Sequence, residues 1–260
     1  MELWTKEHAL VILPAFAIEL VLAIVLGKLL KNKSEKIRLI PIGIIGAILL
    51  VLEVLKQIIW GFGGDSYTLY AIPLHFCSLF LYVYPLTFFI KGRLQNAIRN
   101  ITIVCGATLT LLMLVYPVLI FSASDITEYF TKFISFHTVT FHLLAVFGFM
   151  LMLSLNLHQF KTKEDCLSIL IGFSGYSLIA AIMANILKTN FNSFYYFQVD
   201  AIDSARQSIV NALGGRGQLL YVIVVWLIVV AVCMMCYWLV RLGKYIVNKI
   251  SNKIHKKQSN

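Results

Sequence analysis

The stretch that decides the fold is residues 39–61, LIPIGIIGAILLVLEVLKQIIWG, in which only two side chains are charged. At 1.5 Å per residue, a helix of this length crosses the ~30 Å hydrocarbon layer of a membrane. Both charges, Glu53 and Lys56, lie in its second half. The stretch therefore predicts a transmembrane helix that carries a polar patch near one end.

Six further apolar runs of similar length surround this one, and the whole chain shares its character. Of the 260 residues, 60% are hydrophobic and 13% charged, against roughly 45–50% and about 25% in an average soluble domain. This composition excludes an ordinary water-soluble fold. We expect an all-α, polytopic membrane bundle of seven transmembrane helices, with a single integral membrane domain over 1–243 and a basic tail over 244–260. The six further runs cover approximately 9–30, 70–90, 98–121, 131–155, 166–187 and 217–240.

Basic residues alternate between successive connections. Sixteen of the 22 Lys and Arg residues lie in the first, third and fifth connections and after the last run. By the positive-inside rule, this pattern predicts an N-terminus outside and a C-terminus in the cytoplasm. The sixteen are Lys28, Lys31, Lys33, Lys36, Arg38, Lys91, Arg93, Arg99, Lys161, Lys163, Arg241, Lys244, Lys249, Lys253, Lys256 and Lys257.

The net charge of +10 is explained by this topology, so we expect no nucleic-acid partner. The basic tail predicts a short amphipathic segment that rests on anionic lipid of the inner leaflet, and a solvated tail is the alternative. The longest connection, 188–216, is too aromatic for a free linker, and we expect it at the outer membrane interface. Its aromatic residues are Phe191, Phe194, Tyr195, Tyr196 and Phe197.

The topology places polar side chains of four helices at one depth in the outer half of the membrane. Ionisable groups inside a membrane are costly and mark functional sites, so this convergence predicts one site. The alternative is purely structural. In that case Glu53 and Lys56 form an ion pair, and the histidine side chains only form hydrogen bonds to the helices that they face. The convergent residues are Glu53, Lys56 and Gln57, then His75 and Cys77, then His137 and His142, and finally Asn185, Thr189 and Asn190. Glu19, in the middle of the first run, either joins this cluster or contacts Lys28.

The residue types in this cluster favour acid–base chemistry. His137 and His142 are five residues apart, which is not the i,i+4 spacing of common helical zinc sites. Although His75 would offer a third ligand, we expect no metal and no cofactor. Histidine changes charge near neutral pH and suits proton transfer. Cys77 would act as a nucleophile only beside a base, which a histidine of 131–155 would have to supply, and a packed thiol is the favoured alternative.

The remaining cysteines also lie in or beside apolar runs, which argues against a disulfide framework. Cys233 and Cys236 form a C-x-x-C pattern, but they lie inside the last run and have no partner pair. Packed side chains are therefore the favoured interpretation of Cys233 and Cys236, over a metal or redox pair.

One motif resembles a known family. The string Ile72-Pro73-Leu74-His75-Phe76-Cys77-Ser78-Leu79-Phe80 resembles the Leu-Pro-Leu-His-Leu-Cys signature of the YwaF-type bacterial integral membrane proteins. The Glu53-x-x-Lys56 pair, the stretch 136–142 and the segment from Asn185 to Asn190-Phe191 are similar to that family in order and spacing. The resemblance covers roughly 50–225 and implies a multi-pass protein of a bacterial plasma membrane.

These bacterial proteins are similar to the eukaryotic transmembrane-protein-164 acyltransferases, which move fatty acyl groups between phospholipids, and more distantly to androgen-induced membrane hydrolases of fatty-acid esters. The resemblance implies a lipid-acyl enzyme that uses His75 and a histidine of 131–155. In the eukaryotic acyltransferases the proposed cysteine nucleophile directly precedes the motif histidine, whereas Leu74 stands there in this chain and Cys77 follows two residues later. A histidine-activated hydroxyl of the acceptor is therefore an alternative to a covalent intermediate.

The leading hypothesis is a lipid acyltransferase or transacylase that acts on acyl esters at the outer leaflet. One histidine would take a proton from the attacking hydroxyl, and the other, with Asn185 or Asn190, would stabilise the oxyanion. Its expected partner is a membrane phospholipid or acyl-lipid. The first alternative is a small-solute transporter or receptor that binds its ligand at Glu53, Lys56, Gln57 and the histidines. The second is a structural partner of another membrane complex.

Overall fold

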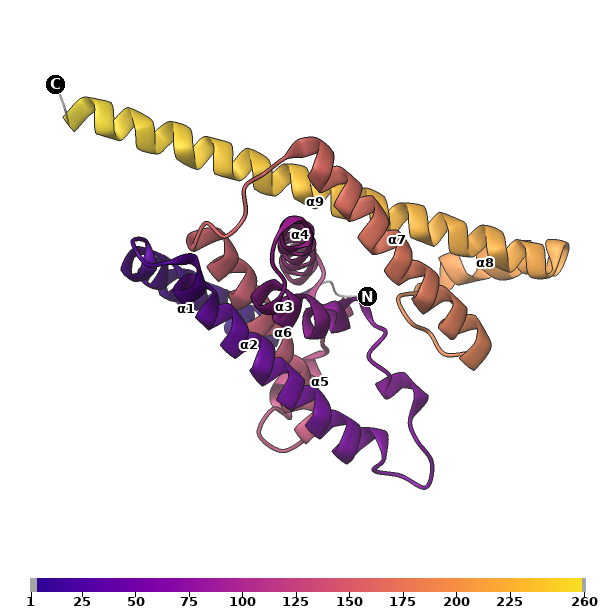
Figure 1. Cartoon of the computed structure of the whole chain (residues 1–260). Coiled ribbons are helices and arrows are strands. Elements are labelled where there is room, and N and C mark those ends of the chain that lie inside the picture. The colour runs from indigo at the N-terminus through magenta and orange to yellow at the C-terminus, as the bar shows by residue number, and fades with distance from the viewer. Residues whose placement is uncertain (1–3, 259–260) are drawn as a thin grey trace.

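The computed structural model describes residues 4–258, with side chains as far as Ile250, and every regular element in this part of the chain is a helix (Figure 1). Within this described part of the chain, six helices are long and apolar enough to cross a membrane. The all-α membrane fold predicted from composition is confirmed, while the seventh crossing and the orientation stay predictions. The six are α1 (Lys6–Leu30), α2 (Glu35–Lys56) with its π-helical extension η1 (Gln57–Gly61), α4 (Arg93–Val115), α6 (Phe133–Ser154), α7 (Thr162–Leu187) and α9 (Gly215–Gln258).

The run 70–90 is not the continuous helix that its hydropathy predicts. It forms two short 3-10 turns, η2 (Leu69–Ala71) and η3 (Phe76–Leu79), followed by the ten-residue helix α3 (Phe80–Phe89). Pro73 has no N–H to donate and disfavours helical backbone at the residue before it. Ile72 accordingly has a non-helical ψ of 129°, and the backbone is still extended at His75, with φ −76° and ψ 153°. The motif that contains His75 is therefore a break in the chain, and α3 begins only after it.

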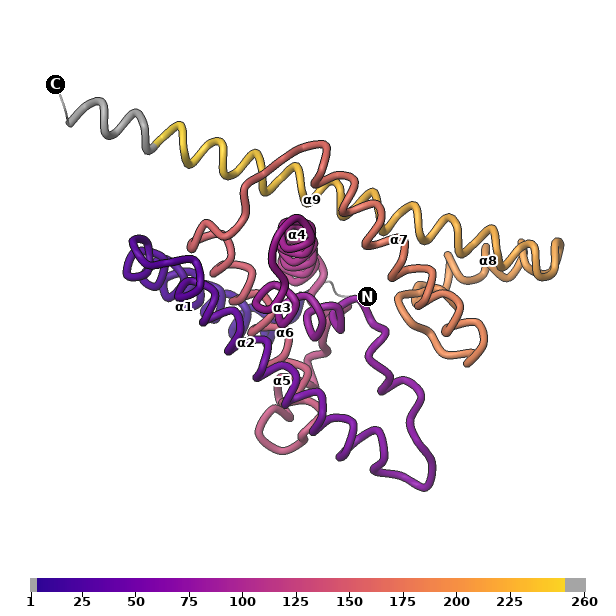
Figure 2. The backbone as a smooth tube through the Cα atoms, in the orientation of Figure 1, coloured from indigo at the N-terminus to yellow at the C-terminus, as the bar shows by residue number. Residues whose placement is uncertain are grey.

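Helix α4 lies at the centre of the bundle. It packs against α3 and α6 on one side and against α7 and α9 on the other, while α1 and α2 pack against α6 (Figures 1 and 2). The contact between α4 and α6 is close, because a Cβ on Gly106 would lie 2.3 Å from the Cβ of Phe149. This arrangement leaves α1, α7 and α9 with long exposed apolar faces.

The connection 188–216 contains a helix, α8 (Asp200–Leu213), which pairs with the start of α9. Phe191 and Phe194 are fully buried against Ala180 and Ala184 of α7 and Tyr221 of α9. The predicted position of the connection 188–216 at the outer membrane interface stays a prediction. Phe191 and Phe194 form a small core of their own because α7 presents alanines to the loop and α9 adds Tyr221. Two other connecting elements are η4 (Pro117–Leu119) and α5 (Ala123–Thr127).

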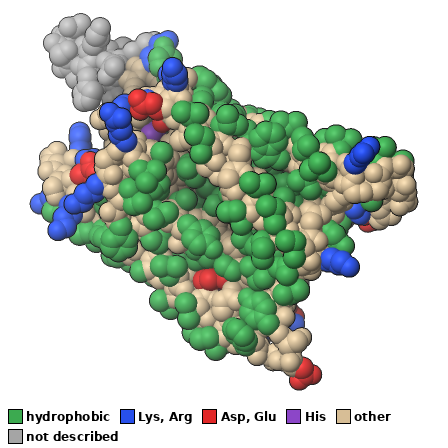
Figure 3. All heavy atoms as spheres, turned by 45° about the vertical axis from the view of Figure 1, so that its right-hand side comes forward, with side chains coloured by type: hydrophobic (Ala, Val, Ile, Leu, Met, Phe, Trp, Pro, Cys, Tyr) green, Lys and Arg blue, Asp and Glu red, His purple; other side chains and the backbone are tan. Residues whose placement is uncertain are grey.

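The predicted basic connections meet at one end of the molecule. Arg38 donates to the carbonyl oxygen of Leu155 at 2.9 Å, and Arg99 donates to that of Leu157 at 2.9 Å and to Glu35 at 2.6 Å. Lys244 donates to Asn156 at 2.7 Å. A broad hydrophobic face separates the charged side chains at the two ends of the molecule (Figure 3).

Helix α9 runs without a break into the basic tail, so the tail begins as an extension of the last crossing and not as a separate segment. The side chains of Lys253, Lys256 and Lys257 lie outside the described residues. The predicted contact of the tail with anionic lipid stays a prediction.

Candidate functional site

The last turns of α2 hold a buried ion pair. The Nζ atom of Lys56 lies 2.9 Å from Oε1 of Glu53, and the two side chains are only 9% and 10% exposed. Their i,i+3 spacing puts them on one face of the helix, as the sequence indicated. Removing two charges from water is costly unless each is paired, so the contact offsets part of the cost of burying them.

Gln57 extends this pair toward the broken run 70–90, the third apolar segment of the chain. Its amide nitrogen donates to Glu53 at 2.5 Å and to the carbonyl oxygen of Ala71 at 2.7 Å, and its amide oxygen accepts from Tyr67 at 2.5 Å. The residue begins the π-helical turn η1, and such turns occur frequently at functional sites. Tyr67 was not singled out from the sequence, because a tyrosine in a polar loop carries no distinguishing pattern.

His137 of α6 faces the same carboxylate. Its Nε2 atom lies 3.8 Å from Oε2 of Glu53, is buried, and has no hydrogen-bond partner among the described residues. The distance exceeds that of a hydrogen bond, but it brings the imidazole within reach of the carboxylate. Lys56, Glu53 and His137 thus form a row of ionisable groups from α2 to α6.

His142 lies one and a half turns further along α6. Its Nδ1 atom is 2.6 Å from the carbonyl oxygen of Thr138. Because a carbonyl only accepts, Nδ1 carries the hydrogen, which leaves Nε2 of the neutral ring as an acceptor. The ring packs near Phe121 and Phe141.

His75 is held by the break in the third segment. Its Nε2 atom lies 3.2 Å from the carbonyl oxygen of Tyr70, so the hydrogen is on Nε2 and Nδ1 is the acceptor. The imidazole also contacts the ring of Tyr70, with centroids 4.3 Å apart, and that of Phe191, at 5.3 Å.

Asn192 fixes the backbone on both sides of His75. Its side-chain nitrogen donates to the carbonyl oxygen of Leu74 at 2.8 Å, and its side-chain oxygen accepts from the N–H of Phe76. Tyr176 of α7 also donates to Leu74, at 2.7 Å. Irregular backbone at membrane depth requires such partners. Sequence reasoning missed Asn192 and Tyr176, because only the fold shows which distant side chains satisfy the break.

Lys56 lies within electrostatic range of all three histidines, and His75 lies within range of His142. The structure therefore brings Glu53, Lys56, Gln57 and His137 into one contact group, with His75 and His142 nearby.

Asn185 and Asn190 belong to a different group. The amide nitrogen of Asn185 donates to the carbonyl oxygens of Ala181 and Phe194, and its oxygen accepts from Gln218 at 2.9 Å. The side-chain oxygen of Asn190 lies 3.4 and 3.3 Å from the N–H groups of Tyr195 and Tyr196. Thr189 donates to the backbone of Leu187. The two asparagines organise the loop after α7, and both side-chain N–H groups of Asn185 already have acceptors.

Cys77 lies in the 3-10 turn η3, partly buried among core side chains. Among the described residues, no histidine makes a hydrogen bond to its thiol. No group of three or more His, Cys, Asp or Glu residues that could hold a metal ion occurs in this part of the chain either. Glu19 has one buried carboxylate oxygen without a hydrogen-bond partner and lies in electrostatic range of Tyr84.

A second buried histidine and carboxylate pair was also missed. His158 Nε2 lies 3.2 Å from Asp165 Oδ1 at the basic end, where Tyr237 donates to the other carboxylate oxygen at 3.1 Å. His158 follows an apolar run, and nothing in its spacing indicated a partner.

The model of one protein family, described as the TMEM164 family, matches residues 3–237. The search of curated proteins and the search of solved structures returned no match.

Proposed function

We propose, for a chain that belongs to the TMEM164 family, that it transfers acyl groups between lipids at the outer leaflet, with histidine as the acid–base catalyst. The observation that carries the proposal is the row of Lys56, Glu53 and His137, a buried set of ionisable groups in a membrane-spanning bundle. The similarity to acyltransferases that move fatty acids between phospholipids supplies the reaction class.

The row supports a division of roles. A carboxylate beside Nε2 favours the tautomer with hydrogen on that atom, which leaves Nδ1 of His137 as the base. His137 takes the proton of the acceptor hydroxyl while the hydroxyl oxygen attacks the ester carbonyl. The imidazolium then returns this proton to the alkoxide of the donor lipid as the ester bond breaks.

The developing oxyanion needs a donor. Asn185 has no free N–H for this role, because its two are directed at backbone carbonyl oxygens. The Lys56 ammonium has three N–H groups, and Glu53 is its ion-pair partner, so we assign the oxyanion to Lys56. His75 and His142, each with one lone pair free, are alternative bases, and Cys77 is the alternative nucleophile.

The experiment is acyl transfer by purified protein in liposomes that contain a fluorescent-acyl phospholipid and an unlabelled lysophospholipid. Removing a general base lowers rates by about 10²–10⁴-fold, and His137→Ala should do so. The matched control is His158→Ala, which removes the other buried histidine with a carboxylate neighbour. Equal losses in both variants would show that His137 acts only on folding, and full activity of His137→Ala and His142→Ala would refute the assignment.

The same buried charges also suit a small-solute transporter, because intramembrane ionisable groups commonly mark solute or proton paths. In that function, Glu53→Gln would abolish uptake or proton coupling in liposomes, and no acyl ester would change in any variant. Solute flux without acyl transfer in the wild-type protein would decide for the transporter.

A further inference from the structure

One short sequence motif occurs twice in the chain. An acidic residue is followed at i+3 by a basic residue and at i+4 by glutamine, as Glu53-x-x-Lys56-Gln57 at the end of α2 and as Asp203-x-x-Arg206-Gln207 in α8. Residues three and four apart are neighbours on a helix, and in both copies the cation and the glutamine bind the carboxylate. Contacts that only one copy makes are therefore specific to its surroundings.

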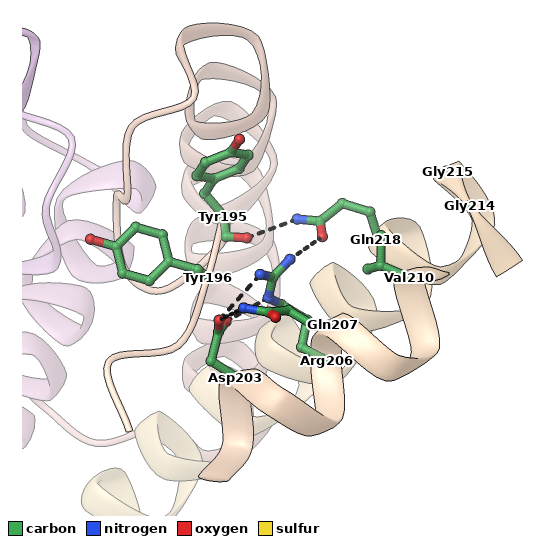
Figure 4. Close-up of a pocket in the computed structure, with 9 residues that line it drawn as sticks. All are labelled: Tyr195, Tyr196, Asp203, Arg206, Gln207, Val210, Gly214, Gly215 and Gln218. Carbon is green, nitrogen blue, oxygen red and sulfur yellow. Dashed lines mark hydrogen bonds and ion pairs between the residues drawn. The ribbon is translucent and has the colours of Figure 1, made fainter. Parts of the chain in front are cut away.

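The copy in α8 lines an open cavity between α8, the loop 194–197 and the first turn of α9 (Figure 4). Arg206 Nε donates to Asp203 Oδ1 at 2.6 Å, and Gln207 Nε2 donates to Oδ2 at 2.7 Å. The hydrogen bond from Arg206 is the main reason why the pKa of Asp203 is lowered to about 2. Gln207 is exposed, and among the described residues none donates to its amide oxygen. The motif alone thus keeps a carboxylate ionised but does not fix its glutamine.

The copy in α2 differs at its glutamine, which is held on both sides. Gln57 Nε2 donates to the carbonyl oxygen of Ala71 at 2.7 Å as well as to Glu53, and Gln57 Oε1 accepts from the hydroxyl of Tyr67 at 2.5 Å. Turning the amide over would bring its oxygen against the Ala71 carbonyl and the Glu53 carboxylate, which only accept hydrogen bonds. Gln57 therefore has a single orientation.

This orientation decides which oxygen of Glu53 faces His137. Oε1 of Glu53 lies 2.9 Å from Lys56 Nζ and 2.5 Å from Gln57 Nε2, while Oε2 lies 3.8 Å from Nε2 of His137. Because both donors meet the same oxygen, a rotation of the carboxylate would stretch both contacts. The other oxygen is thereby directed toward α6.

Gly61 makes room for this arrangement. A Cβ at position 61 would lie 2.9 Å from Cε2 of Tyr67 and 3.1 Å from Oε1 of Gln57, whereas non-bonded carbon atoms prefer about 3.5–4.0 Å. The backbone of Gly61 is not left-handed, so strain does not explain the glycine. The close approach of Tyr67 to Gln57 does.

We propose that Tyr67 and Gln57 are positioning residues, which act on the tautomer of His137 through the carboxylate of Glu53. Tyr67 fixes Gln57, Gln57 fixes Glu53, and Glu53 holds the hydrogen of the imidazole on Nε2. The effect of this chain of contacts on acyl transfer rests on the proposed function. The tautomer of His137 is measurable whether or not the protein transfers acyl groups.

The test is ¹⁵N NMR of purified full-length protein with labelled histidine, in which His137→Gln identifies the signal. Tyr67→Phe and Gln57→Met should each raise the ratio of the Nδ1-H to the Nε2-H form about twofold to tenfold, as the loss of one hydrogen bond would. Gly61→Ala should do the same without removing a polar atom. Since Tyr67 acts through Gln57, the double variant should change the ratio no more than Gln57→Met alone.

Each variant has a matched control that should leave the tautomer ratio unchanged. Gln207→Met alters the same motif away from His137. Tyr129→Phe removes the hydroxyl of another tyrosine in a connection, which forms a hydrogen bond to Thr140 of α6 at 3.0 Å. Gly64→Ala adds a Cβ that would lie no closer than 3.8 Å to its nearest neighbour, the carbonyl oxygen of Ser66.

Acyl transfer in liposomes gives a second readout. Tyr67→Phe should lower kcat about twofold to tenfold and leave KM for the lysophospholipid unchanged, because the hydroxyl supports the base and not the bound substrate. A raised KM with unchanged kcat would instead make Tyr67 a substrate-binding residue and overturn the proposal.

The outcomes separate the two proposals. A wild-type tautomer ratio in Tyr67→Phe and Gly61→Ala would overturn the positioning role even where Gln57→Met fails to fold, and so would an equal change in Gln207→Met. A changed ratio in a protein that transfers no acyl group would support the positioning role and refute the proposed function.

Discussion

Breaking the Glu53–Lys56 pair tests whether water is excluded from the polar end of α2. At 2.9 Å and an effective dielectric constant of about 20, the attraction is about 6 kcal/mol. Burying the two ions costs several kcal/mol each, so the net contribution of the pair is small. Removing one partner differs, because it leaves an unpaired buried charge, and it should cost about 3–5 kcal/mol.

The variants are Lys56→Met, Glu53→Gln and the double substitution, unfolded by titrating detergent-solubilised protein with sodium dodecyl sulfate and followed by circular dichroism. Each single variant should lose about 3–5 kcal/mol, and the double variant should lose less than either one. The control is Lys132→Met, because the Lys132–Glu128 pair is as short, at 2.7 Å, but 59% and 36% exposed. An exposed pair contributes about 0–1 kcal/mol. If Lys56→Met costs no more than Lys132→Met, water reaches the pair and the proposed site is not a low-dielectric one.

Three further predictions use other parts of the fold. Cysteine labelling in intact cells should reach the connection 188–216 from outside and 156–161 from the cytoplasm, and the opposite result would place the site in the inner leaflet. Gly106→Ala should cost about 1–3 kcal/mol by overpacking against Phe149, whereas Gly175→Ala, where a Cβ meets nothing, should be neutral or stabilising, as thermal unfolding would show. Cys77→Ser should retain most acyl transfer if the thiol only packs, and loss of activity together with an acyl-thioester trapped by mass spectrometry would make it the nucleophile.

Hydropathy predicted the membrane helices well because each crossing must satisfy its own backbone hydrogen bonds in lipid. It failed at 70–90, where the apolar composition continues but Pro73 interrupts the helix. Hydropathy does not reflect the loss of one backbone N–H group. Whether a break in a helix inside the membrane is tolerated depends on side chains of other segments, which must replace the lost hydrogen bonds. The burial of Phe191 and Phe194 was missed for a similar reason, because it depends on the alanines that α7 presents to the loop and on Tyr221 of α9.

The site was predictable where it depended on one helix. The spacing of Glu53, Lys56 and Gln57 fixes their mutual contacts before any tertiary structure forms. For His137 and Glu53, the sequence predicted only that both lie at the same depth in the membrane. Depth follows from topology, whereas the direction in which each side chain points depends on how α2 and α6 pack. Asn185 and Asn190 were expected to join this cluster, but their side chains form hydrogen bonds within the loop after α7.

The break in the third segment explains why the loop after α7 has to fold inward. Leaving the helix at Pro73 frees the carbonyl of Leu74 and the N–H of Phe76, and an unsatisfied backbone group in lipid costs several kcal/mol. Asn192 satisfies both, and it does so from a left-handed backbone conformation, φ 53°, which asparagine tolerates better than most residues. Because Asn192 reaches Leu74 only when the loop lies against α7, the burial of Phe191 beside it and the orientation of His75 are consequences of the same contact. The orientation of His75 in the third segment is therefore set by a loop more than a hundred residues away in the sequence.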